Sequence, residues 1–197
     1  MKVEQFVMAY RVEQDRLRAF LPEEYESLRP VLRINAEIRS GIEESVYVEF
    51  NTPVAAFGKR GWLNIANWES PVTEFSFTKD GNATIFTSPF LDIMYKRVGI
   101  EGGCPDEKDD DGCFFNGEKR VFREKEIINV NKEFCDCEFE WKFAEGNARG
   151  VSTGNKSVAV EPTESKKTYD RQKFSAETAA AIECEQIVGS YVVRFDL

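Results

Sequence analysis

The stretch Val31-Leu-Arg-Ile-Asn-Ala-Glu-Ile-Arg39 indicates the fold class of this chain most clearly. Apolar and polar side chains alternate along it, with Leu32, Ile34, Ala36 and Ile38 on the apolar positions. Successive side chains of a β-strand point to opposite faces of a sheet, so a period of two predicts a strand with one apolar and one polar face. The polar face carries Glu37.

Further strands are predicted on both sides of this stretch. Asp80-Gly81 is a strong hairpin signal, because Asp-Gly suits a two-residue turn. In the last third of the chain, one strand face would carry Cys135, Cys137, Phe139, Trp141 and Phe143, a composition typical of a core. The predicted strands are Val3–Tyr10, Val31–Arg39, Val46–Val54, Trp62–Trp68, Thr73–Lys79, Asn82–Thr87, Val121–Val130, Glu133–Phe143 and Tyr191–Phe195.

Three segments have helical spacing of their apolar residues, namely Gln14–Leu21, Pro89–Val98 and Ser175–Val188. Pro22 ends the first of them. Many antiparallel strands with two or three short helices predict an α+β domain, in which the sheet closes into a β-barrel or coils strongly. Such a sheet provides one small-molecule pocket. We expect a single domain over residues 1–197, a length that one domain accommodates.

The composition excludes several classes of partner. The net charge of −9 disfavours nucleic acid and anionic membrane surfaces, since both need concentrated Lys and Arg. No apolar run reaches the length of a membrane span, about 18 residues. The five cysteines, with no disulfide-like spacing, indicate reduced thiols and a cytoplasmic location.

The chain contains no histidine. This excludes Ser-His-Asp and Cys-His nucleophile pairs and every zinc site that uses a histidine ligand. The acidic segment from Glu107 to Glu118 imitates a calcium-binding loop, but a solvated acidic loop explains it better, because the flanking sequence is not helical. We therefore expect neither a metal nor an organic cofactor.

The segment Phe6-Val-Met-Ala-Tyr-Arg-Val-Glu-Gln-Asp-Arg-Leu-Arg-Ala-Phe-Leu-Pro22 resembles the N-terminal region of the acetoacetate decarboxylase family. The resemblance continues through Val31–Glu37 and Val46-Tyr-Val-Glu49, which are similar to strands that end in functional glutamates. It covers about the first third of the chain, with its pieces in the family's order. It implies that Glu37 and Glu49 line a pocket and that the protein forms a homo-oligomer.

The catalytic signature of that family is a Pro-Lys-Lys string followed by an apolar residue and glycine. Tyr95-Lys96-Arg97-Val98-Gly99 is similar to it, with Tyr95 in place of proline and Arg97 in place of the second lysine. The resemblance implies a lyase that decarboxylates a small β-keto acid through a Schiff base on Lys96. Arg97 would favour the neutral amine, and Glu37 and Glu49 would position substrate or move protons.

Two other interpretations remain open. The chain could be a non-catalytic, small-molecule-binding member of the same superfamily, or a β-rich interaction domain. In both, Lys96 and Arg97 would form a solvated surface. In the second, Glu37 and Glu49 would also face solvent.

Overall fold

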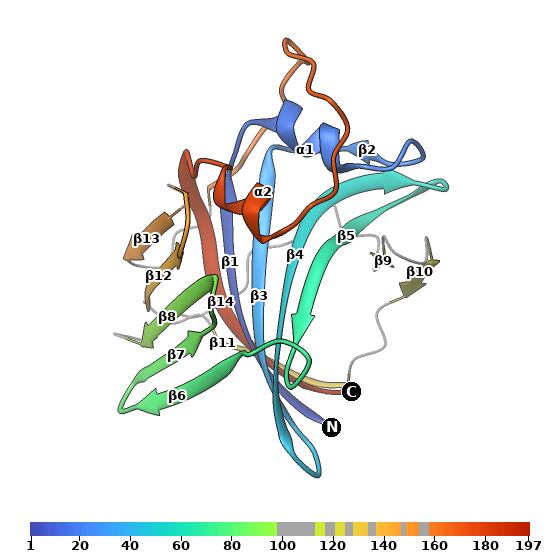
Figure 1. The fold of residues 1–197 in the computed structure, drawn as a ribbon. Coiled ribbons are helices and arrows are strands. Elements are labelled where there is room, and N and C mark those ends of the chain that lie inside the picture. The colour runs from blue at the N-terminus through green and yellow to red at the C-terminus, as the bar shows by residue number, and fades with distance from the viewer. Residues whose placement is uncertain (98–112, 117–120, 125–127, 134–136, 147–148, 154–157) are drawn as a thin grey trace.

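The computed structural model describes residues 1–97, 113–116, 121–124, 128–133, 137–146, 149–153 and 158–197. Over these residues, most of the regular structure is β-strand, and only two short helices occur, α1 (Gln14–Phe20) and α2 (Ala176–Ala180). In Figure 1 both helices lie at one end of a large sheet, and the two chain termini lie at the other end.

The first sheet contains nine strands of the described chain and runs in the order β10-β9-β5-β4-β3-β1-β14-β11, with β2 added beside β4. Its strand pairs are antiparallel except for β5 with β9, which is parallel. The strands are β1 (Lys2–Arg11), β2 (Glu26–Ser27), β3 (Val31–Ser40), β4 (Glu44–Ala56), β5 (Lys59–Glu69), β9 (Cys113–Asn116), β10 (Val121–Glu124), β11 (Ile128–Glu133) and β14 (Gln186–Asp196).

The second sheet is antiparallel and runs in the order β13-β12-β8-β7-β6. Its strands are β6 (Ser76–Asp80), β7 (Ala83–Thr87), β8 (Leu91–Arg97), β12 (Cys137–Phe143) and β13 (Arg149–Thr153). It lies beside β14 and β1 in Figure 1, and β12 and β13 contact β14.

The main hydrophobic core lies between the two sheets. Even-numbered residues of β1, β3 and β4 enter it from one side, and odd-numbered residues of β8 and β12 enter it from the other. Tyr10 packs against Trp141 with ring centroids 4.4 Å apart, and Phe6 packs against Tyr95 at 4.9 Å. Burial of this apolar surface is the dominant favourable term in joining the sheets.

The alternation predicted from Val31–Arg39 is confirmed. Leu32, Ile34, Ala36 and Ile38 all lie in the core between the sheets. The opposite face of β3 is also buried, although it carries Arg33, Asn35 and Glu37. A strand that is buried on both faces but polar on one of them is unusual, because burying polar groups costs free energy unless they are hydrogen-bonded.

Two of the helix predictions are corrected by strand pairing. Residues 91–97, within the predicted helix Pro89–Val98, form β8, because Leu91, Ile93 and Tyr95 also repeat with a period of two and pair with β7 and β12. The predicted helix Ser175–Val188 starts with a capping box at Ser175 but ends at Ala180, and pairing with β1 makes residues 186–196 a strand.

The fold class is α+β and mainly antiparallel, as predicted. Neither sheet closes into a barrel over the described residues, so that part of the prediction is not confirmed. Phe139, Trp141 and Phe143 are buried as predicted. The predictions for Cys135, the side chain of Cys137, residues 107–112 and 117–118 of the acidic segment, and Val98 and Gly99 lie outside the described residues. No helix among those described is long and apolar enough to cross a membrane.

We expect the substitution Gly150→Ala to destabilise the protein by about 1–3 kcal/mol or more. Gly150 pairs with Trp141, and a Cβ atom placed there would lie 1.8 Å from the indole ring, which is held in the core. Gly41→Ala is the matched control, because the nearest heavy atom to its added Cβ is 4.0 Å away. Urea unfolding of the three proteins measures the difference, and equal midpoints would contradict this packing.

Candidate functional site

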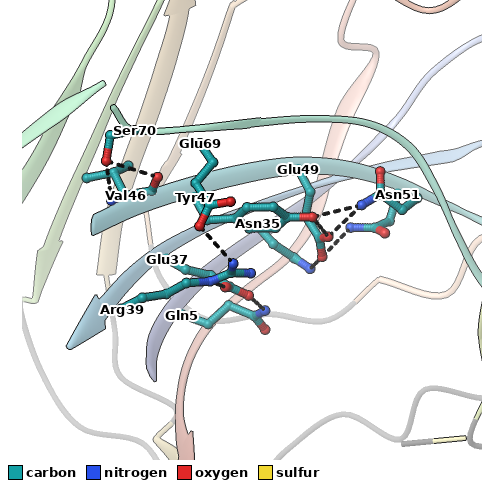
Figure 2. Close-up of polar contacts among 11 residues, drawn as sticks. Gln5, Asn35, Glu37, Arg39, Val46, Tyr47, Glu49, Asn51, Glu69 and Ser70 are labelled. Carbon is teal, nitrogen blue, oxygen red and sulfur yellow. Dashed lines mark hydrogen bonds and ion pairs between the residues drawn. The ribbon is translucent and has the colours of Figure 1, made fainter. Parts of the chain in front are cut away.

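The polar face of β3 and β4 brings Glu37 and Glu49 together. Both side chains point away from the core, because Ile38 and Val48, their neighbours in sequence, point into it. In the antiparallel register Glu49 lies opposite Asn35, and Glu37 lies opposite Tyr47. The two glutamates are therefore diagonal neighbours on one face, a separation that long side chains bridge. Figure 2 shows this group of side chains.

Glu49 is surrounded by hydrogen-bond donors from three strands. Its Oε1 accepts from Asn35 Nδ2 at 2.8 Å and from Asn51 Nδ2 at 3.0 Å. Its Oε2 accepts from the Tyr47 hydroxyl at 2.9 Å and from Asn64 Nδ2 at 2.9 Å. A carboxylate has about four lone-pair sites. Four protein donors therefore occupy the acceptor capacity of Glu49.

Glu37 is more deeply buried, with 4% of its surface exposed. Its Oε1 accepts from Gln5 Nε2 at 2.6 Å, and its Oε2 accepts from Arg39 Nε at 2.7 Å. Burial and the nearby charge of Glu49 outweigh these two contacts and raise the pKa of Glu37 to about 7. A carboxyl group with such a pKa can give or take a proton near neutral pH.

Arg39 is the cation of this cluster. It lies over the Tyr47 ring with its Cζ 3.7 Å from the ring centroid, and it contacts Glu69 Oε1 through Nη1 at 3.3 Å. Burial and the charge of Glu49 hold the pKa of Tyr47 well above its usual range, so its hydroxyl stays protonated as the donor to Glu49. Figure 2 shows one group of polar contacts around Glu37 and another around Glu49. The contact of Arg39 with the Tyr47 ring joins the two groups into one network.

Lys96 and Arg97 lie on β8, outside the network of Glu37 and Glu49. Tyr95 points into the core from β8, so Lys96 points from the outer face of the second sheet, where its Nζ is 3.3 Å from Glu138 Oε2 on β12. The side chain of Lys96 is 42% exposed. Arg97 ends the strand, where its backbone hydrogen-bonds with Asn82. The structure thus brings Glu37 and Glu49 together but separates them from Lys96 by the core.

Sequence reasoning missed most of the network, namely Gln5, Asn35, Arg39, Tyr47, Asn51 and Asn64. For the residues on β3, a signal was present in the period of two, since Asn35, Glu37 and Arg39 share one face. The sequence does not show that this face is buried. A polar strand face is usually solvated, and nothing in Val31–Arg39 alone distinguishes a solvated face from a buried one.

Within the described residues, no group of three or more Cys, Asp or Glu side chains is placed to hold a metal ion. A cavity of about 470 Å³ lies at the end of the molecule where the helices are, between α1 and the segment after Val160. Two of its polar side chains hold that segment: Gln14 Oε1 accepts from Thr163, and Asp15 Oδ2 accepts from the backbone N–H groups of Lys166 and Lys167. These contacts indicate a structural role.

We expect the stability of the protein to fall between pH 5 and pH 8 relative to that of the Glu37→Gln variant. The pKa of Glu37 is about 7 in the folded state and near 4.5 when exposed, so in this range the folded state holds a proton that the unfolded state releases. The difference in unfolding free energy between the two proteins should change by at most about 3 kcal/mol. Urea unfolding at four pH values measures it.

Glu138→Gln is the control for this measurement, because it makes the same chemical change at a carboxylate that is 40% exposed. The curve of Glu37→Gln should depart from that of the unchanged protein by more than the curve of Glu138→Gln does. If both variants depart from it equally, Glu37 ionises normally and the description of the cluster is wrong.

Comparison with known proteins supports the fold. No family model and no curated protein matches the sequence. Among solved structures, acetoacetate decarboxylase from Legionella pneumophila matches with a TM-score of 0.60 at 12% identity, over 99% of this chain and 82% of that one. An acetoacetate decarboxylase-like enzyme from Sphingomonas wittichii matches with a TM-score of 0.53 at 10% identity, over 98% and 87%.

A third structure is the enduracididine biosynthesis enzyme MppR complexed with pyruvate. It matches with a TM-score of 0.51 at 11% identity, over 98% of this chain and 84% of that one. All three likenesses extend over nearly the whole chain, well beyond the N-terminal third in which the sequence resemblance lies. The described strands and their order, together with these three matches, show that this chain has the acetoacetate decarboxylase-like fold.

Proposed function

We propose that this chain binds a small molecule over the polar face of β3 and β4, with the Glu37–Glu49 network as the polar part of the site. One observation carries the proposal: Glu37, Asn35 and Asn51 are at least 96% buried on a sheet face that does not belong to the main core. Buried ionisable groups with shifted pKa values are concentrated at functional sites.

The structural neighbours support a small-molecule ligand. MppR has been solved with pyruvate and with HEPES buffer bound, and its fold is similar to that of this chain over 98% of this chain. In the proposed site, Glu49 holds the three asparagines and Tyr47 in fixed orientations. Glu37 provides the group that exchanges a proton near neutral pH.

This proposal is tested by ¹⁵N-resolved NMR titration with small organic acids, amines and amides. We expect at least one compound to shift the backbone amide signals of residues 35, 37, 47 and 49. Glu49→Gln should abolish that response, because an amide at this position cannot accept from all four donors. The Glu138→Gln control should retain it. If no compound shifts these signals, the proposal fails.

A second candidate is decarboxylation of a small β-keto acid through Lys96. Its support is the likeness to acetoacetate decarboxylases and the string Tyr95–Gly99. The neutral Lys96 amine would condense with the ketone and release water. The imine would then take up the electron pair of the breaking carbon–carbon bond as CO₂ leaves, and protonation and hydrolysis would release the ketone product. Glu37 and Glu49 could not reach that imine, because they lie beyond the core.

This candidate predicts that acetoacetate with sodium borohydride labels Lys96, because reduction traps the imine as a stable secondary amine. Peptide mass spectrometry would locate the adduct, and Lys96→Ala would remove it. Lys142→Ala is the matched control, since Lys142 is another exposed lysine on the outer face of the second sheet. Absence of label in the unchanged protein, or label that persists in Lys96→Ala, would exclude the Schiff base at this residue.

Assembly into a homo-oligomer and a cytoplasmic location stay predictions.

A further inference from the structure

Asn35 presents a buried acceptor that the described protein leaves unused. The residue is 2% exposed, and its Oδ1 has no hydrogen-bond partner. Its Nδ2 donates to Glu49, which fixes the orientation of the amide. Because the nitrogen and the oxygen of an amide point in different directions, Oδ1 is turned away from Glu49. A buried acceptor without a donor costs free energy, so an N–H or O–H group that donates to this oxygen would stabilise it.

The surroundings of Asn35 determine the sign of charge that a ligand can carry. The carboxyl groups on this face are Glu37, Glu49 and Glu69. Its cations are Arg39, which contacts Glu37 and Glu69, and the buried Arg33, whose Cζ lies 3.6 Å from the centroid of the Trp62 ring. Arg39 is already engaged by Glu37, by Glu69 and by the Tyr47 ring. When Glu37 is ionised, three carboxylates face two guanidinium groups, so the face has an excess of negative charge that repels an anionic ligand and attracts a cationic one.

Glu37 is the second group available to such a ligand. It lies two residues from Asn35 on the same strand face, and it receives one donor on each oxygen, from Gln5 and from Arg39. Each carboxylate oxygen has a further lone pair, so Glu37 retains acceptor capacity that Glu49 does not have. Asn35 and Glu37 thus offer two neighbouring acceptors.

We propose that Asn35 Oδ1 and the Glu37 carboxylate together accept hydrogen bonds from a small organic cation that carries N–H donors, such as an alkylammonium or guanidinium group. This inference rests on the proposed binding function and specifies its ligand class. Arg39, Tyr47 and Gln5 are only partly buried and form the side of the cluster that reaches solvent. The cation would enter past them.

Binding of a cation would be linked to release of a proton from Glu37 to solvent. The charged and titratable groups that face Glu37 are Arg39 on its own strand, Tyr47 and Glu49 on β4, and Glu69 on β5, and Gln5 contacts it from β1. With the pKa of Glu37 at about 7, the ionised fraction rises about tenfold between pH 6 and pH 8. Affinity for the cation should rise by the same factor.

Methylguanidinium, propionamide and acetoacetate serve as cationic, neutral and anionic probes in NMR titrations at pH 6 and pH 8. We expect methylguanidinium to shift the amide signals of Asn35 and Glu37 and to bind about tenfold more tightly at pH 8. In Glu37→Gln the binding should be weaker and equal at the two pH values. In Asn35→Leu it should weaken at both pH values but keep its pH dependence, and in Glu138→Gln it should be unchanged.

Two results would overturn the cation assignment and leave the binding function standing. One is binding of acetoacetate at these residues without binding of methylguanidinium. The other is binding of propionamide as tight as that of methylguanidinium, with no dependence on pH. Failure of these three probes, together with failure of the wider set of compounds, would overturn the binding function itself. If Asn35→Leu does not fold, the pH dependence in Glu37→Gln still decides the question.

Discussion

The architecture depends on the alternation of side chains along β3. One set of its residues fills the space between the two sheets, and the other set lies on a second buried face. Since adjacent residues must point in opposite directions, the packing of Ile34, Ala36 and Ile38 against the second sheet fixes the side on which Asn35 and Glu37 lie. A register slip of one residue would send Glu37 into the core. The position of the network is thus set by hydrophobic packing on the other side of the same strand.

Glu49 and Glu37 have different roles in the network because they accept different numbers of hydrogen bonds. Glu49 receives four donors, and its negative charge is distributed over three amide groups and one hydroxyl. Glu37 accepts hydrogen bonds from only two donors and is more deeply buried. Its carboxyl group therefore exchanges a proton near neutral pH. Two carboxyl groups on neighbouring strands therefore differ in behaviour because of their surroundings.

Much of the fold follows from the sequence because period-two alternation is a local signal. It located the first strands. The Asp80-Gly81 turn signal located the hairpin of β6 and β7, although its two turn residues are Gly81 and Asn82, because Asp80 pairs with Ala83. The alternation failed at residues 91–97, where helical and strand periods both fit and the pairing of Ile93 with Trp141 decides. It also placed Glu37 and Glu49 on polar strand faces. It could not give the burial of that face or the partners of the two glutamates, which come from segments that are distant in the sequence, such as Gln5 and Asn64.

The pairing of β1 with β14 has a consequence for the route by which the protein folds. This ladder joins Lys2 to Asp196 and continues to Arg11 with Gln186, so two neighbouring strands of the first sheet come from the two segments that are farthest apart in the chain. Closing so long a loop is entropically costly, and contacts of this kind slow folding. Until β14 docks, one edge of β1 is unpaired and Phe6 and Met8 lack part of their cover. A chain in which β14 has not docked therefore exposes an open, apolar strand edge, which is the kind of surface that promotes aggregation.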